Sequence, residues 1–246
     1  MRMNKLLNII NKTLNDIYVD DCNCIICDKE LSIKNRYGLC RNCLKDIPKN
    51  NGKVCIRCGK PIYDEAEYCM VCQNNERFFD RVNSPLVYKG TSEKLILNYK
   101  FYNKRYLVKY LVSYLVDEYL DKGYNSDIII PVPLTDNVLR ERSFSQTDLI
   151  AEELGKRLNI PVGIDIVKKI KDTAHQAKLG GKERQLNVAG AFSLIGNVKG
   201  MKVLIVDDIL TTGATLSELA RIIWKGKPLA VEGLTIANAE YKAYGE

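Results

Sequence analysis

Short apolar runs alternate with amphipathic stretches along the part of the chain that follows residue 84. Unbroken apolar character over four to seven residues is typical of strands that are buried on both faces of a parallel sheet. Such runs predict strands at 128–132 and 203–206. Another strand is predicted at 230–236, with weaker strand patterns at 85–88 and 162–167. Helical spacing of apolar residues predicts helices over 92–120, in two pieces, 145–158 and 212–224. This alternation predicts an α/β domain over 84–246: right-handed βαβ units, a parallel sheet flanked by helices, and a ligand at the carboxyl ends of the strands.

The chain before residue 84 has a different pattern. Apolar residues at helical spacing over 1–21 (Leu6, Leu7, Ile10, Leu14 and Ile17) predict a short amphipathic leader helix. No apolar run approaches the roughly 18 residues that a spanning helix needs, so we expect no membrane span. Asn8, Asn11 and Lys12 interrupt the leader, which therefore lacks the apolar region of a signal peptide. We expect a cytoplasmic protein.

Nine cysteines, the whole complement of the chain, lie between Cys22 and Cys72. Eight of them form four Cys-x-x-Cys pairs, and two consecutive pairs make one unit, so the segment 22–75 contains an internal repeat. Each pair places two thiolates where both can reach one cation, and two pairs complete the closed Cys₄ geometry of structural zinc. We therefore predict a double zinc ribbon and two Zn²⁺ sites, in preference to disulfides or redox thiols. The predicted ligands are Cys24, Cys27, Cys40 and Cys43 in one site, and Cys55, Cys58, Cys69 and Cys72 in the other.

An interleaved pairing of the same cysteines is the alternative, and the sequential one is favoured because each unit then closes its own loop. Cys22 is left over and is interpreted as a spare thiol. The ribbons could offer a surface to nucleic acid or to a partner. The favoured interpretation is that zinc stabilises the fold of a segment too small to have a core of its own, because the region carries nearly as many acidic as basic groups.

The segment 203–215 carries the most specific chemistry in the chain. A buried strand leads to Asp207 and Asp208, and a loop of small hydroxyl residues then opens a helix. Backbone N–H groups at a helix N-terminus attract phosphate, and Gly213 allows the backbone to approach it closely. The two carboxylates suit ribose hydroxyls or a divalent cation beside that cradle. The chain lacks the Walker and dinucleotide-binding motifs, so the segment predicts a site for a sugar phosphate.

This segment resembles, position by position, the signature of the type I phosphoribosyltransferases, which bind phosphoribosyl pyrophosphate (PRPP) with Mg²⁺. The resemblance implies that Asp207 and Asp208 hold the ribose 2- and 3-hydroxyls, and that Thr211 to Thr215 surround the 5-phosphate. The implied PRPP-binding residues in this segment are Asp207, Asp208, Ile209, Leu210, Thr211, Thr212, Gly213, Ala214 and Thr215.

Further segments resemble the ComF competence proteins, which combine a double zinc ribbon with such a domain. They are 131–134, with Pro133 and Leu134, then 140–146, and the 173–192 region that contains His175, the one histidine. Arg140 and Arg142 are the expected catalytic donors to the leaving diphosphate, and Lys100 is a further candidate for PRPP. The chain has Ser143 and Ser145 where the family usually has Gly and Asn, which alters the loop rather than the fold.

The resemblance implies a PRPP- and Mg²⁺-binding protein that acts in DNA uptake and in handling single-stranded DNA, with other competence proteins as partners. An active phosphoribosyltransferase of nucleotide metabolism and a PRPP-sensing regulator without turnover are the alternatives. A stripe of tyrosines over 99–114 could stack on DNA bases, but a role at the rim of the core is favoured. The formal net charge of +7 falls to about +3 when two Cys₄–Zn²⁺ sites form, so bulk charge does not indicate a nucleic-acid binder.

Overall fold

The computed structural model describes residues 23–31, 35–63, 65–101, 104–135, 137, 139, 144–171 and 188–239. The predicted leader helix, Cys22, Arg140, Arg142 and His175 lie outside these residues. In chain order the elements are two short helices, α2 (Arg41–Asp46) and α3 (Met70–Asn74), then β1 (Val82–Asn83), β2 (Leu86–Val87), α4 (Gly90–Phe101), the 3₁₀ helix η1 (Arg105–Leu107), α5 (Val108–Asp121), β3 (Ile128–Pro131), α7 (Gln146–Leu158), β4 (Val167–Lys169), β5 (Phe192–Leu194), β6 (Lys202–Leu210), α9 (Ala214–Trp224) and β7 (Ala230–Asn238).

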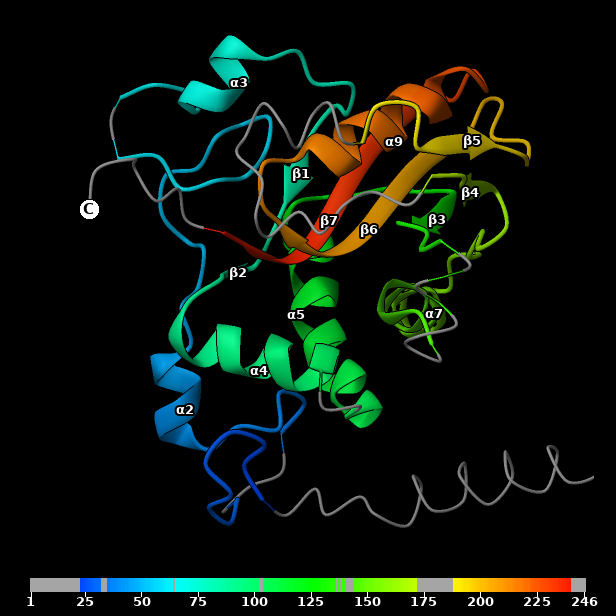
Figure 1. The fold of residues 1–246 in the computed structure, drawn as a ribbon. Helices are drawn as coiled ribbons and strands as arrows, with labels where there is room; N and C mark the ends of the chain where they lie inside the picture. The colour runs from blue at the N-terminus through cyan, green and yellow to red at the C-terminus, as the bar shows by residue number, and fades with distance from the viewer. Residues whose placement is uncertain are drawn as a thin grey trace, which may run out of the picture.

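A parallel sheet with the order β1-β7-β6-β3 forms the centre of the molecule, and β2 extends the β1 edge by pairing with β7 (Figure 1). Helix α9 covers one face, and α5 and α7 cover the other. Successive residues of β6 alternate between these layers: Val203 and Ile205 pack with α9, whereas Leu204 and Val206 pack with α5 and α7. The strand is therefore buried on both faces, and the predicted fold class is confirmed.

Local signals placed several helix ends correctly. The Ser145 hydroxyl accepts a hydrogen bond from the backbone N–H of Asp148 at 3.2 Å and caps α7, while Asn159 ends the helix in the left-handed conformation. The predicted break in the 92–120 helix is present as η1 between α4 and α5. None of the helices in the described ranges is long and apolar enough to cross a membrane.

Two strand predictions and one helix start need correction. The expected strand over 162–167 is only a single bridge from Val162 to Ile129, followed by β4, which pairs with β5 in a separate antiparallel ribbon. Strand β6 continues past the predicted end at Val206 to Leu210, because β7 offers pairing partners along this whole length. As a result α9 begins at Ala214 instead of Thr212.

Candidate functional site: a phosphate loop beside paired carboxylates, and two Cys₄ clusters

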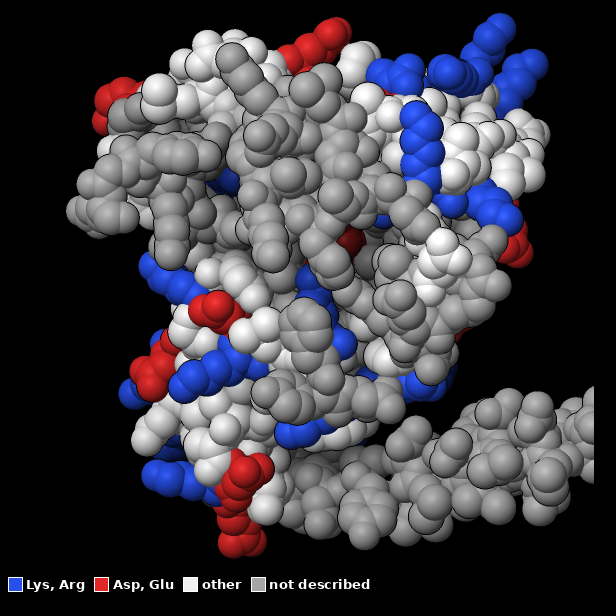
Figure 2. All heavy atoms as spheres, in the orientation of Figure 1, with Lys and Arg blue, Asp and Glu red and all other residues white. Residues whose placement is uncertain are grey.

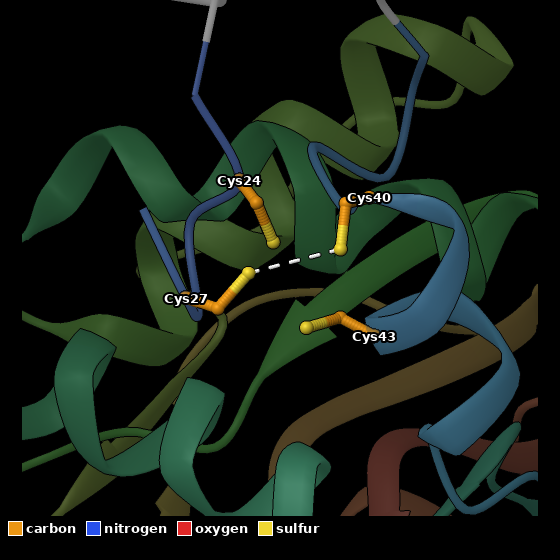
Figure 3. Close-up of side chains that lie close together, drawn as sticks. All are labelled: Cys24, Cys27, Cys40 and Cys43. Carbon is orange, nitrogen blue, oxygen red and sulfur yellow. Dashed lines mark hydrogen bonds between the residues drawn. The ribbon is translucent and has the colours of Figure 1, made fainter. Parts of the chain in front are cut away.

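Two Cys₄ clusters form within the N-terminal segment, each with its four sulfur atoms within 4.8 Å of one another. The grouping is sequential: Cys24, Cys27, Cys40 and Cys43 form the first cluster, and Cys55, Cys58, Cys69 and Cys72 form the second. Figure 3 shows the four side chains of the first cluster converging, with a Cys27–Cys40 sulfur separation of 3.7 Å. The Cys58–Cys69 separation in the second is 3.6 Å. A tetrahedron with Zn–S bonds of about 2.3 Å has edges of about 3.8 Å, so both donor sets fit Zn²⁺.

The two units repeat the same backbone hydrogen bonds. Cys24 N donates to Lys29 O at 2.7 Å, and Cys55 N donates to Lys60 O at 2.8 Å. Asp28 and Gly59 take the same left-handed conformation in these turns, with φ of 56° and 66°. A short helix starts directly after the third cysteine of each unit. The Cys43 backbone N–H lowers the pKa of the Cys40 thiol to about 7, which favours the thiolate form that binds metal.

The two ribbons lie at opposite ends of the molecule (Figure 1). Cys24, in the first, belongs to the hydrophobic core that includes Leu111 of α5. Cys55 and Cys58, in the second, belong to the core on the α9 face, together with Leu210 and Leu216 on either side of the predicted phosphate loop. Among the described residues, the second ribbon and not the first shares a hydrophobic core with the residues on either side of the loop 211–213, the predicted phosphate loop.

Asp207 and Asp208 lie near the C-terminal end of β6. They follow Val206, which pairs with Pro131, the last residue of β3, so they lie beyond the end of that neighbouring strand. They are therefore at the open carboxyl end of the sheet, where parallel α/β folds bind ligands. Burial, and next the charge of Asp208, raise the pKa of Asp207 to about 7 from its usual 3.8. The backbone N–H of Asp208 donates to the Asp207 carboxylate at 2.8 Å.

Lys100, at the end of α4, brings a cation to this pair. Its Nζ lies 2.8 Å from the Asp208 carboxylate, and both side chains are less than one-fifth exposed. The end of α4 is held in place by the buried Tyr99, whose hydroxyl donates to the carbonyl of Gln146 at 2.7 Å. The structure thus places Lys100 with the predicted carboxylates.

The loop between β6 and α9 joins the carboxylates to a helix N-terminus. Gly213 is the N-cap residue of α9 and has φ of 75°, a conformation that side chains disfavour. The backbone N–H of Ala214 donates to the Thr212 hydroxyl at 3.3 Å. The side chain of Leu210 is buried in the core and lies beneath the glycine turn, with Cδ1 3.5 Å from the position that a Cβ on Gly213 would occupy. Strand end, glycine turn and helix start therefore follow one another in the predicted order, and the binding of a phosphate by this loop stays a prediction.

Of the remaining predicted residues, the structure describes Pro133 and Leu134. Pro133 and Leu134 are half-buried and follow β3 directly. The segment with Arg140 and Arg142 connects them to the start of α7, where the Thr147 hydroxyl donates to the carbonyl of Val132 at 2.8 Å.

Arg77 is a residue of the site that sequence reasoning did not single out. Its Nη2 donates to the carbonyl of Thr212 at 2.7 Å, across 135 positions of sequence. No local pattern distinguishes this arginine from the exposed ones, and only its burial in the structure does.

Most of the described tyrosines in the 99–114 stripe belong to the core. Tyr99, Tyr110 and Tyr114 are buried, whereas Tyr106 is 44% exposed. Figure 2 shows Lys and Arg side chains at several places on one face, with acidic groups among them. The favoured interpretation of these tyrosines, at the rim of the core, agrees with this burial.

Comparisons with known proteins match both parts of the chain. The phosphoribosyl transferase domain family matches residues 145–242, and the double zinc ribbon domain family matches residues 17–73. Competence protein F of Haemophilus influenzae is 32% identical over 221 residues, which cover 87% of this chain and 94% of that protein. The DNA utilization protein YhgH of Escherichia coli K12 is 27% identical over 214 residues, 85% of this chain and 93% of that protein. Competence protein ComFC of Bacillus subtilis is 25% identical over 240 residues, 88% of this chain and 95% of that protein.

Proposed function

Because the chain belongs to the competence protein F family, we propose that it binds PRPP with Mg²⁺ and acts in the uptake or use of DNA. The observation that carries the PRPP proposal is the continuous series of carboxylate pair, glycine turn and helix N-terminus at the open end of β6. A ribose hydroxyl donates to a carboxylate, and a phosphate accepts from backbone N–H groups and hydroxyls. Their order along the chain matches the order of these groups in a sugar 5-phosphate.

The charges of the site fit a cation that accompanies the ligand. Of the two adjacent carboxylates, Asp208 is ion-paired with Lys100, and burial together with the charge of Asp208 raises the pKa of Asp207. Carboxylate oxygens are ligands that Mg²⁺ prefers, usually with substrate phosphates completing its coordination. Asp207 and Asp208 are the residues we assign to the ribose and its cation, and Mg²⁺ would neutralise the diphosphate.

Transfer of the ribosyl group would need donors for the leaving diphosphate. Arg140 and Arg142 keep that proposed role, since an arginine fork matches phosphate oxygens and their segment joins β3 to α7 at the same end of the sheet. Lys100 is proposed to interact with PRPP from the α4 side. Release of pyrophosphate when PRPP is mixed with a panel of bases and amines would identify an enzyme, while binding without release would favour a sensor.

The proposed DNA role comes from the relatives, which are competence and DNA utilization proteins. Because most of the tyrosine stripe is buried, we expect any contact with single-stranded DNA at exposed lysines such as Lys168, Lys171 and Lys227. Contacts of this kind depend on phosphate charge and weaken as salt rises.

Isothermal titration with PRPP and Mg²⁺ tests the binding proposal. We expect the wild-type protein to bind, and the Asp207→Ala/Asp208→Ala variant to lose binding, since both acceptors for the ribose are removed. Asp121→Ala, which removes an exposed carboxylate at the end of α5, is the matched control and should bind as wild type does. Absence of binding by the wild type, or equal binding by the double variant, would contradict the proposal. Complementing a deletion strain with the same variants, and measuring transformation frequency, then tests whether the site serves DNA uptake.

A further inference from the structure

We propose that Arg77 is a positioning residue of the phosphate loop, and that through it the segment following the second Cys₄ cluster becomes part of the PRPP site. This inference rests on the proposed function, because it assigns a role toward the phosphate that the loop would hold. Arg77 lies five residues after Cys72 and five before β1, between the ribbon and the sheet.

The guanidinium of Arg77 spans two residues of the loop. Its Nη2 donates to the carbonyl of Thr212 at 2.7 Å, and Nη1 lies 3.7 Å from the position that a Cβ on Gly213 would occupy. A hydrogen bond from a cation to a backbone carbonyl is stronger than one between neutral groups. The contact therefore fixes the peptide that turns β6 into α9 and places positive charge against the cradle.

The charge of Arg77 has no counterpart of its own in the described part of the chain. The residue is only 9% exposed, its Nε has no hydrogen-bond partner, and no described carboxylate lies within ion-pair distance of it. The buried Lys60 lies nearby: burial and, more weakly, Arg77 lower its pKa, while the thiolates of Cys58, Cys69 and Cys72 raise it. Buried charges in proteins are normally paired, because removing them from water is costly. An anion in the loop that Arg77 contacts would supply the missing negative charge.

The neighbours of Arg77 hold its backbone rigidly. The backbone N–H of Phe78 donates to the hydroxyl of Ser217, in the first turn of α9, at 3.3 Å. The indole N–H of Trp224, at the other end of α9, donates to the carbonyl of Phe78 at 2.6 Å. On the ribbon side, Arg57 Nη1 donates to the carbonyl of Phe79 at 3.1 Å. The two hydrogen bonds of Phe78 to α9 fix where the guanidinium lies, and the bond from Arg57 holds the segment further along, at Phe79.

Titration of PRPP with Mg²⁺ into Arg77→Met, Arg57→Met and Arg77→Lys variants tests the inference. Methionine keeps much of the arginine's apolar volume without its charge, and we expect PRPP affinity to fall about tenfold or more, the range of a charge-assisted hydrogen bond. Arg57→Met removes a comparable hydrogen bond, the one from Arg57 to the backbone carbonyl of Phe79 in the same segment. This bond lies away from the loop, so the variant should bind PRPP as wild type does. Arg77→Lys keeps the charge and should recover part of the lost affinity. Melting temperature and two bound zinc ions per chain establish that each variant is folded.

The outcomes separate this inference from the proposed function. Failure of the wild type to bind PRPP removes the proposed function itself. Binding by the wild type together with equal binding by a folded Arg77→Met or Arg77→Lys variant overturns only the role of Arg77. An equal loss in Arg57→Met also overturns it, because the effect would then come from general loosening of the segment. If Arg77→Met does not fold, Arg77→Lys decides: we expect weakened binding, and wild-type affinity refutes the role.

Discussion

The adjacent carboxyl groups of Asp207 and Asp208 destabilise the unliganded protein at the predicted site. Adjacent carboxylates repel each other, and Lys100 compensates one of them. The pKa of Asp207 rises to about 7 because burial and Asp208 both disfavour its charged form. Such an arrangement weakens the unliganded fold and favours a ligand that brings hydroxyl donors and a cation.

Asp207→Asn should make the unliganded protein more stable at pH 8. In the wild type the folded state retains a proton that the unfolded state loses above its usual pKa of 3.8, so the free energy of unfolding falls as pH rises from about 4 to about 7. Asparagine keeps the oxygen that accepts from the Asp208 N–H but cannot ionise. We expect a gain of about 1 to 4 kcal/mol at pH 8 and little gain at pH 4.

Urea denaturation in Mg²⁺-free buffer at several pH values measures this difference. Lys100 and Lys169 also act on Asp207 and lower its pKa, so a variant of either lysine should enlarge the pH dependence instead. An Asp207→Asn curve that runs parallel to the wild-type curve between pH 4 and pH 8 would show that folding does not raise the pKa of Asp207.

The residues of the site differ in how far the sequence could predict them. The acidic pair and the glycine turn lie within one short segment of the sequence, so the local pattern was sufficient to predict both. The contact of Lys100 with Asp208 joins positions 108 apart and follows from how α4 packs, and the burial of Arg77 follows from how the second ribbon packs. Neither has a local signal, because burial is decided by distant parts of the chain.

At the level of elements, the sequence can predict a helix end that depends on local hydrogen bonds. It cannot predict the length of a strand, which depends on the strand that pairs with it. The Ser145 cap and the Asn159 stop of α7 depend on residues within one turn. The length of β6 depends on β7, which pairs with Asp207, Ile209 and Leu210. Pairing of β4 with β5 was missed for the same reason, since it joins segments on either side of the 171–190 region.

Ser145→Ala should lower the free energy of unfolding by about 1 kcal/mol, because it removes the hydroxyl that caps α7. Ser145 is buried and also lies 3.0 Å from the Thr147 hydroxyl, so no water can replace the lost acceptor easily. Ser145→Thr keeps the hydroxyl and should stay near wild type. Thermal or urea denaturation measures both, and equal stability of the alanine and threonine variants would show that the cap contributes little.

At the scale of the whole molecule, the two ribbons serve different cores. The first packs against the layer of α5, and the second packs against the layer of α9 beside the phosphate loop. Their sequence repeat is close to symmetric, yet their surroundings are not. The sequence predicted the repeat and the sequential clusters but could not assign either ribbon to a face of the sheet.

Loss of the second zinc site should therefore affect ligand binding more than loss of the first. Cys69→Ser/Cys72→Ser removes two ligands of the second site, and we expect PRPP affinity to fall about tenfold or more, the range expected when the charged contact of Arg77 to the loop is disturbed. Cys40→Ser/Cys43→Ser, the matched change in the first site, should keep PRPP affinity within about threefold of the wild-type value while lowering thermal stability. Zinc content and titration measure these effects, and an equal loss of affinity in both variants would show that the ribbons act only on general stability.

The pairing of β1 and β2 with β7 also sets an order of assembly during synthesis. Val82 pairs with Gly233, and Leu86 pairs with Ala237, so the strands that leave the ribosome first wait for the one that leaves last. The two Cys₄ clusters are complete once Cys72 has emerged and can bind zinc before the sheet exists. Until residues 230–238 emerge, β6 lacks a neighbour on one side and its apolar residues remain uncovered there. Truncation near the C-terminus would therefore leave a metal-loaded N-terminal segment attached to an aggregation-prone chain.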